Sequence, residues 1–438
     1  MAEHGAGESM ARGALSGIRV VEFTQIVSGP ACGRVLAELG ADVIRVEPPD
    51  GDPKRNLGAV VPGEGKSFQS LNLGKRSITL DLQSEAGREI ARRLAQTADI
   101  VLCNYRYGVA ERLGIDYETL SSVNLTLIYG RITGFGVRSS AATRGAVNGV
   151  VEAYAGLLVG GGKLDADGLP ASNSATAFTD YTAGYSAAIA VVAALYHRRE
   201  TGEGQLVDCS LLRAVLSVQD QHVMREPIQD VTFRDPLVQR LEAVRANGGN
   251  YREMLEAREK SLSGSRGLNV YHAAFAARDG VIVLGASTAK TREAARRVLD
   301  IADDPVLTPP IEDIHAPEYL AALQRLNQQF TDAIAANTVA RWVELFNDAG
   351  CPAAPVNFPE EMSDDPIVQA EGLMIPTVHS ITGPQHVLGP LFEMSASPTR
   401  VQGASPALGE HSREILLEAG FDDAEVNALE AAGVLRHK

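Results

Sequence analysis

Residues 18–47 read IRVVEFTQIVSGPACGRVLAELGADVIRVE, and this stretch decides the fold of the chain. Its apolar ends predict strands over Ile18–Phe23 and Asp42–Glu47. Between them, Pro30–Leu39 predicts a helix, because proline is favoured in a first helical turn and Gly40 ends the pattern. A strand, a helix and a strand at this spacing form a βαβ unit, whose two strands run parallel.

The same alternation continues through the first half of the chain. Further strands are predicted at Ser77–Leu82, Ile100–Cys103, Thr126–Thr133 and Gln205–Ser210, and helices at Glu85–Thr97 and Asp180–Arg199. This order predicts an α/β fold with a parallel sheet covered by helices. Beyond it, residues 225–266 are charged and contain Pro227 and Pro236, which indicates an irregular crossover. Residues 271–285 then predict a hairpin with its turn at Asp279-Gly280.

The composition limits the possible partners. Of 438 residues, 45% are hydrophobic and 22% charged, as in folded globular proteins. The net charge of −15 argues against a nucleic-acid surface but leaves room for one local phosphate site. No apolar run reaches the ~20 residues of a spanning helix, so no membrane partner is expected. The four scattered cysteines suggest neither a metal site nor disulfides, and a cytoplasmic location is expected.

Short motifs occur along nearly the whole chain. They are LSGIRVVEF (15–23), SGP (28–30), LGADVIRVE (39–47), GKRS (74–77), LDL (80–82), NY (104–105), ERLG (111–114), ITGFG (132–136), DYTAG (180–184), RRETGEGQ (198–205), RDG (278–280) and LGEH (408–411). In this order they resemble the class III coenzyme A transferases, the CaiB/BaiF family that includes formyl-CoA and carnitine CoA transferases. The resemblance extends from about Leu15 to Leu435.

The resemblance implies an enzyme that moves CoA from an acyl-CoA to a carboxylic acid, with no permanently bound cofactor. Asp180 matches the family's nucleophile, which attacks the thioester, forms a mixed anhydride and then becomes an aspartyl-CoA thioester. A helix start would help this carboxylate stay ionised, since the dipole end there is positive. The N–H groups of Thr182, Ala183 and Gly184 could contact a developing oxyanion. The alternative is that Asp180 merely caps the helix.

Six further residues are candidates for binding CoA. Lys75, Asn104, Tyr105 and Arg112 match CoA-binding positions of the family. Gln25 and Ser28 follow the first strand, where parallel sheets bind ligands, and either could polarise the thioester carbonyl. Ordinary structural roles remain open for all six: a lysine flanking a strand, an Asx turn, a buried ring, a solvated Glu–Arg pair on a helix, and turn chemistry.

The chain departs from the formyl-CoA branch at two places. That branch has a glutamine where Val27 stands, and a run of four glycines whose nearest counterpart is Ser263-Gly-Ser-Arg-Gly267. Formate and oxalate are therefore not the expected substrates.

Three different functions remain possible besides CoA transfer between two separate acids. An acyl-CoA racemase of the same fold needs a histidine before the aspartate, but none occurs between Gly136 and Asp180. The racemase glutamate before the Asp-Gly turn is also missing, since Ala276 and Ala277 stand there. The second possibility is a non-catalytic acyl-CoA-binding protein, and the third is an enzyme that transfers CoA intramolecularly, between the two carboxylates of one diacid.

The family fold implies a large Rossmann-like α/β domain built from both chain ends, a smaller α/β domain, and an interlocked homodimer. On this basis we predict five segments. They are a flexible leader (1–14), the first part of the large domain (15–224), a crossover linker (225–268), the small domain (269–350) and a return segment that completes the large domain (351–438).

Overall fold

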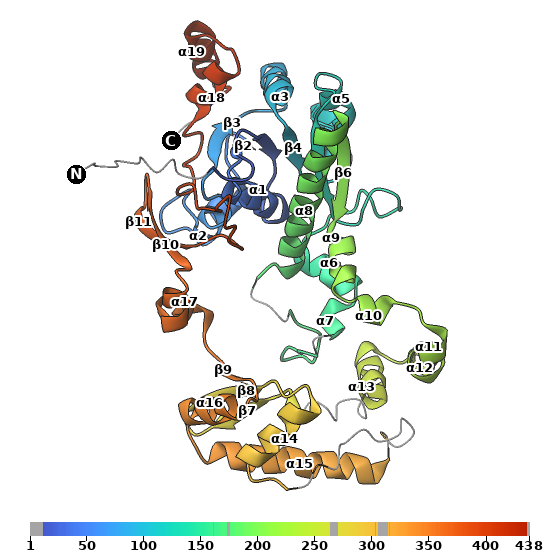
Figure 1. The fold of residues 1–438 in the computed structure, drawn as a ribbon. Helices are drawn as coiled ribbons and strands as arrows, with labels where there is room; N and C mark the ends of the chain where they lie inside the picture. The colour runs from blue at the N-terminus through green and yellow to red at the C-terminus, as the bar shows by residue number, and fades with distance from the viewer. Residues whose placement is uncertain are drawn as a thin grey trace, which may run out of the picture. The chain divides into compact units, whose positions relative to one another are not determined.

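A six-stranded parallel sheet organises the first half of the chain (Figure 1). Its strands lie in the order β3-β2-β1-β4-β5-β6, and each neighbouring pair is parallel. They are β1 (Arg19–Phe23), β2 (Asp42–Glu47), β3 (Arg76–Thr79), β4 (Ile100–Cys103), β5 (Ile128–Thr133) and β6 (Gln205–Ser210). This arrangement confirms the predicted α/β class and parallel sheet.

The computed structural model describes residues 12–160, 162–172, 176–262, 270–302, 304, 314 and 316–435. Most of the predicted leader and the glycine-containing stretch at 263–267 lie outside them. The chain divides into unit 1, formed by Met1–Met224 with Pro366–Lys438, and unit 2, formed by Arg225–Asp365.

Helices cover both faces of the unit 1 sheet. Successive strand residues point to opposite faces, so neighbouring apolar residues of β1 lie in two different cores. Val20 faces a core shared with α1 (Ser28–Glu38), α8 (Phe178–Thr201) and α9 (Leu211–Ser217). Val21 faces a second core, shared with α3 (Glu85–Thr97), α18 (Ser412–Glu418) and α19 (Asp423–Ala431). Residues from near the carboxyl end of the chain therefore complete the second face.

The other elements of unit 1 are mostly short. They are η1 (Pro53–Arg55), α2 (Lys66–Gln69), α4 (Val109–Leu113), α5 (Tyr117–Ser121), α6 (Asn148–Tyr154), α7 (Leu157–Gly160), α10 (Asp220–Val223), α17 (Pro366–Ala370), β10 (Met374–His379) and β11 (Gly383–Leu388). The last two form an antiparallel hairpin that the sequence pattern did not predict.

Unit 2 combines a small antiparallel sheet with helices. Its elements are α11 (Pro227–Thr232), α12 (Arg234–Ala246), α13 (Tyr251–Leu262), β7 (Ala274–Ala277), β8 (Gly280–Leu284), α14 (Ala289–Val298), α15 (Pro317–Ala335), α16 (Val339–Asp348), β9 (Ala353–Pro355) and η4 (Pro359–Asp364). The predicted hairpin is present as β7–β8, and β9 pairs with β8.

The segment predicted to be irregular is instead helical. Pro227 is the first residue of α11, and Pro236 lies in the first turn of α12. A proline breaks a helix interior but is tolerated in the first turn, where the N–H it lacks has no helical partner.

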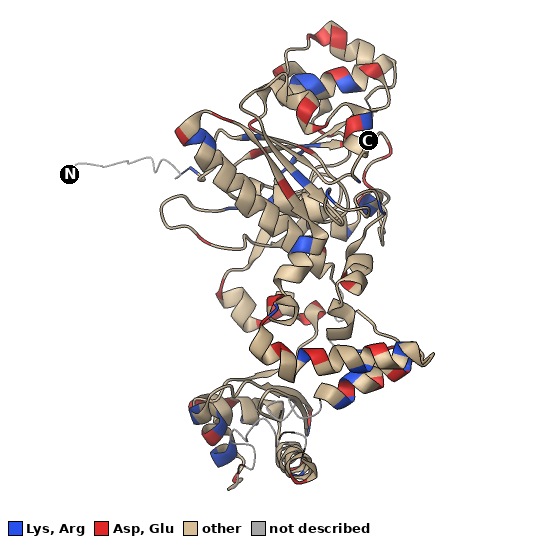
Figure 2. Ribbon diagram, turned by 90° about the vertical axis from the view of Figure 1, so that its right-hand side faces the viewer, with Lys and Arg blue, Asp and Glu red and all other residues tan. Residues whose placement is uncertain are grey.

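Helix α8 is uncharged except at Asp180 and at Arg198–Glu200 near its carboxyl end (Figure 2). By length and composition alone it would be able to cross a membrane. The core helix of a folded domain has the same properties, and α8 packs against α1, β5 and β6. Its small buried residues, including Ala183, Gly184 and Ala187, form that contact face.

Candidate functional site

The candidate site lies where the strand order reverses. β1 pairs with both β2 and β4, so the chain leaves these central strands in opposite directions along the sheet. Open α/β sheets bind ligands at the carboxyl ends of the strands at such a point. Gln25 and Ser28 follow β1 here, and Asn104 and Tyr105 follow β4.

The Asn104 side chain joins the two strand ends. Its Oδ1 accepts from the Gln25 N–H at 2.8 Å, and its Nδ2 donates to the Gln25 carbonyl at 2.8 Å. The same Nδ2 also donates to Ser28 Oγ at 3.2 Å, which leaves the serine O–H free to donate elsewhere. The structure thus brings three of the predicted residues into direct contact.

The turn between β1 and α1 is held in an unusual conformation. Ile26 has φ of 65°, a left-handed conformation that is rare for a β-branched residue. Its N–H donates to Asp52 Oδ2 at 3.0 Å, and Asp52 is only 2% exposed. Conformations of this kind cost about 1–3 kcal/mol and cluster at functional sites. The sequence pattern gave no indication of a role for Asp52.

Close packing of α8 on α1 brings Asp180 toward this turn. A Cβ on Gly184 would lie 2.5 Å from the Ser28 carbonyl oxygen, so only glycine permits this approach. Asp180 is one helical turn earlier on the same face of α8. Ala177, just before α8, and Tyr181, next to Asp180, pack against an apolar cluster of Val27, Ala31 and Leu71.

The amino end of α8 is capped from another helix. Asn148 Oδ1 accepts from Thr179 N at 2.9 Å and from Asp180 N at 3.3 Å. The N-cap position is Ala177, so the alternative that Asp180 is the cap is wrong. The expected oxyanion role of residues 182–184 is also corrected, because their N–H groups lie in the helix interior and bond within it.

The Asp180 carboxylate is 8% exposed and, among the described residues, accepts no hydrogen bond. Burial raises its pKa to about 6; the charge of Lys54 opposes this rise and the charge of Glu152 adds to it. Burial thus outweighs the helix-start effect expected from the sequence. At pH 7.5 the carboxylate remains mostly ionised, as a nucleophile must be.

Lys75 lies beneath the site rather than at its surface. Its ammonium donates to Glu22 Oε1 at 2.8 Å, to the Pro30 carbonyl at 2.9 Å and to Asn72 Oδ1 at 3.0 Å. An ammonium has three N–H donors, so none remains for a CoA phosphate in this arrangement. We reassign Lys75 to the support of α1.

Tyr105 and Arg112 stand apart from the other candidates. The Tyr105 ring packs against the core on the α3 face of the sheet, and its burial raises the pKa of the phenol. Arg112 is exposed on α4. In the part of the chain that the structure describes, no cluster of three or more His, Cys, Asp or Glu side chains offers a metal site.

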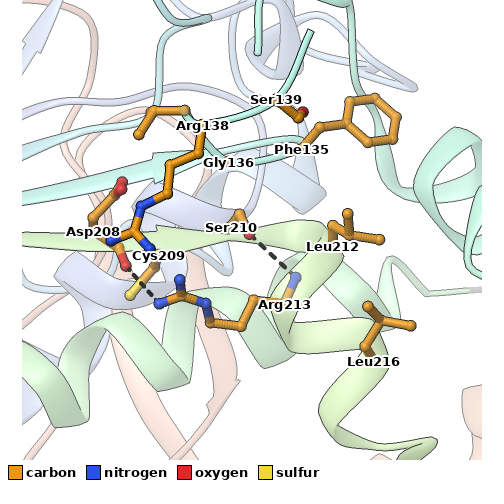
Figure 3. A pocket seen from close by; sticks show the side chains of 11 residues that line it. Phe135, Gly136, Arg138, Ser139, Asp208, Cys209, Ser210, Leu212, Arg213 and Leu216 are labelled. Carbon is orange, nitrogen blue, oxygen red and sulfur yellow. Dashed lines mark hydrogen bonds between the residues drawn. The ribbon is translucent and has the colours of Figure 1, made fainter. Parts of the chain in front are cut away.

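A concavity of about 330 Å³ opens elsewhere, at the carboxyl ends of β5 and β6 (Figure 3). Arg138 and Arg213 turn toward Asp208 within it, and Arg213 Nη1 donates to the Asp208 carbonyl at 3.3 Å. None of the seven predicted site residues lines this pocket.

Comparison with known proteins agrees with this geometry. The model of CoA-transferase family III matches residues 15–412. The formyl-CoA:oxalate CoA-transferase of Streptomyces coelicolor is 30% identical over 96% of this chain and 99% of its own length. The succinate–glutarate CoA-transferase of Agrobacterium fabrum is 31% identical over 92% of this chain and 95% of its own length. A CaiB/BaiF family protein from Brucella suis superposes with a TM-score of 0.70 at 28% identity, covering 93% of this chain and 100% of its own. The chain belongs to CoA-transferase family III and is a CoA-transferase.

Proposed function

We propose that the enzyme transfers CoA from an acyl-CoA to a free carboxylic acid through covalent intermediates on Asp180. The carboxylate attacks the thioester carbonyl, CoA leaves as a thiolate, and an aspartyl anhydride forms. The thiolate then attacks the aspartyl carbonyl of the anhydride, which releases the first acid and leaves an aspartyl-CoA thioester. A second acid reverses both steps.

The observation that carries this proposal is the state of Asp180. Its carboxylate is buried, has no hydrogen-bond partner among the described residues, and lies beside the carboxyl end of β1. A merely structural buried carboxylate is normally paired, because an unpaired buried charge is costly. A poorly solvated, ionised carboxylate is also a stronger nucleophile than a hydrated one.

The other residues take supporting roles in the proposal. Asn104 orients the Ser28 hydroxyl, which donates to the thioester oxygen as negative charge develops there. Gln25, exposed at the same edge, can contact the thioester from the solvent side. Arg112 binds a CoA phosphate by a charge-assisted contact, and Tyr105 borders the adenine end of the site.

The acid pair is proposed only as a class. The relatives act on small carboxylic acids, as their names state. Val27 lies in an apolar cluster against which Tyr181 packs, and this favours an acid larger and less polar than formate or oxalate. We also propose a cytoplasmic location, since all four cysteines are free thiols.

Trapping the intermediate tests the mechanism. Acyl-CoA added without acceptor acid should leave CoA covalently bound to the protein, and peptide mass mapping should place the adduct on Asp180. Hydroxylamine should release it, because it cleaves thioesters and anhydrides. CoA exchange without any adduct, or an adduct at another residue, would contradict covalent catalysis at Asp180.

We further propose a homodimer, supported by an apolar groove on unit 1. The groove has a volume of about 480 Å³. Four residues of α8 line it together with Ala14, Leu15, Val35, Leu39, Leu391, Phe392 and Met394. Ile189 is 73% exposed and Phe392 44% exposed. Exposed apolar surfaces of this kind mark interaction sites.

The family's interlocked arrangement predicts an unusually persistent dimer. Interlocked chains cannot separate without unfolding, so sedimentation should show one dimer mass from micromolar to low nanomolar protein. Activity per chain should stay constant over the same range. A folded, active monomer at low concentration would exclude interlocking.

A further inference from the structure

One buried carboxylate joins two loops at the edge of the candidate site. Asp52 Oδ2 accepts from the Ile26 N–H at 3.0 Å, and Asp52 Oδ1 accepts from the Lys54 N–H at 2.7 Å. The Arg45 guanidinium, itself fully buried, holds the same carboxylate. Lys54 in η1 is therefore anchored beside the turn that links β1 to α1.

This turn is also the part of the sheet edge nearest to the nucleophile. Val27 belongs to a small apolar cluster with Ala31 and Leu71, and Tyr181, the residue after Asp180 on α8, packs against this cluster. Ile26, next to Val27, is fixed in its left-handed conformation by the bond to Asp52. Contacts therefore lead from Lys54 through Asp52 and this turn to the cluster against which the start of α8 packs.

Lys54 and Asp180 are oppositely charged, and neither forms an ion pair within the part of the chain that the structure describes. Among the described residues, the half-buried Lys54 ammonium has no hydrogen bond or ion pair, and neither has the Asp180 carboxylate. Lys54 is close enough to attract the carboxylate, but the two do not form a direct ion pair. The other charge acting on Asp180 is Glu152, which repels it, and Asp180 in turn raises the pKa of the neighbouring Tyr181 phenol, whose burial is the larger cause of that rise. The cation and the carboxylate therefore attract each other without being paired.

The chemistry of the proposed function suggests a role for Lys54. When Asp180 becomes an aspartyl-CoA thioester it loses its negative charge, and Lys54 loses its counter-charge. An incoming carboxylate restores that charge at the position from which it must attack. We propose that Lys54 binds the carboxylate of the acceptor acid, and so is a specificity-determining residue for anionic acceptors. This inference rests on the proposed function.

The step requires no additional reactant. A carboxylate oxygen of the acceptor attacks the thioester carbon on Asp180, the C–S bond breaks, and CoA leaves as the thiolate. The thiolate then attacks the acceptor's carbonyl carbon in the anhydride, the C–O bond to Asp180 breaks, and the aspartate carboxylate is restored. Lys54 contributes only its positive charge, and no proton is transferred in either step.

The test compares Lys54→Gln with Lys54→Arg and with Lys66→Gln. Lys66 is an exposed lysine on neighbouring α2, outside the proposed machinery, and serves as the matched control. In Lys54→Gln the KM for the acceptor acid should rise about 10- to 100-fold, the range expected for losing one charge-assisted contact. The KM for acyl-CoA should change less than about 2-fold, and the CoA adduct should still form on Asp180. Lys54→Arg should restore most of the acid binding.

The pH profile gives a second readout, which a purely structural role would not move. Lys54 favours the charged form of Asp180, so its removal should raise the pKa of Asp180 above about 6. The acidic limb of kcat/KM should therefore move to higher pH in Lys54→Gln and stay in place in Lys66→Gln.

Two results would overturn the role of Lys54 while leaving the proposed function intact. One is an unchanged acid KM in a Lys54→Gln enzyme that still exchanges CoA. The other is an equal rise in both KM values, which would indicate general damage to the site. Failure of the wild-type enzyme to form any Asp180 adduct would instead overturn the proposed function, and this inference with it.

Discussion

Asp180→Asn should lower CoA exchange by about 10⁴-fold or more, since the proposed nucleophile is lost outright. The amide keeps the size of the side chain but removes the negative charge that the proposed mechanism requires. No other acidic residue lies between Ala171 and Arg199 to replace it. Exchange assays and mass spectrometry on the same sample should show neither turnover nor adduct.

The same variant should be more stable than the wild type, which separates a lost nucleophile from a damaged fold. The pKa of Asp180 rises from 3.8 to about 6 on folding, so at pH 7.5 the folded state holds a charge it disfavours. Removing that charge should add about 1–3 kcal/mol to the free energy of unfolding. Asp348→Asn, an exposed change on α16, should alter it by less than about 0.5 kcal/mol.

The sign of the pH dependence follows from the raised pKa. The destabilising effect of Asp180 is complete above pH 6 and disappears as pH falls through the interval down to 3.8. The gain in unfolding free energy of Asp180→Asn over the wild type should therefore shrink as the pH falls from about 6 to 3.8. Mass spectrometry should first show that the substituted asparagine side chain has not deamidated. Near wild-type CoA exchange in such a sample would refute the role of Asp180 as the nucleophile. A large loss of stability would show that Asp180 is structural.

The sheet was predictable because its strands are encoded locally. β2, β4 and β6 have the bounds that their apolar runs predicted, and α3 begins and ends as expected at Glu85 and Thr97. The prediction of α1 began two residues late, at Pro30 instead of Ser28, because Ser28 and Gly29 resemble a turn. Ser28 and Gly29 are also the residues that Asn104 and α8 approach closely, so the small side chains that the site needs there hide the start of the helix.

The rest of the site depends on long-range contacts that the local sequence does not encode. Asn148 caps α8 from a different helix, and Asp52 holds a turn 26 residues away. One signal was available, however. Buried parallel strands are usually continuous apolar runs. Glu22, Arg45 and Glu47 interrupt β1 and β2 near their carboxyl ends, and all three prove to be buried.

These interruptions form a buried network of charges on the α1 side of the sheet. Arg45 Nη1 donates to Glu22 Oε1 at 3.0 Å and to Thr24 Oγ1 at 3.2 Å, and the guanidinium also pairs with Asp52. Arg55 binds Glu47 through Nε at 2.8 Å and Nη2 at 2.7 Å. Burial alone would raise the pKa of Glu47, but Arg55 and Arg45 outweigh burial and lower it. Both guanidinium groups also lie over the Phe68 ring, with the central carbon of Arg45 5.2 Å and that of Arg55 3.8 Å from the ring centroid.

Arg45→Met should therefore cost about 3–5 kcal/mol of unfolding free energy, because it leaves the buried Asp52 carboxylate without its cation and removes one of the two cations that pair with Glu22. Arg92→Met, which removes exposed ion pairs on α3, should cost less than about 1 kcal/mol and is the matched control. The difference in unfolding free energy between the wild type and Arg45→Met should become smaller as the pH falls below about 4.5, where Glu47 accepts a proton in the unfolded chain. Urea titrations of the three proteins at pH 7.5 and pH 4 measure both effects.

The Arg45 network also connects stability to catalysis. Arg45 fixes Asp52, and Asp52 fixes both the strained Ile26 and the backbone of Lys54. In Arg45→Met at a temperature where the chain is still folded, kcat should thus fall while the Asp180 carboxylate itself is unchanged. Arg45→Lys keeps the charge but cannot reach Glu22 and Asp52 together, so it should recover part of the stability and less of the activity. If Arg45→Met instead loses stability with wild-type kcat in the folded fraction, the network stabilises the fold without positioning the site.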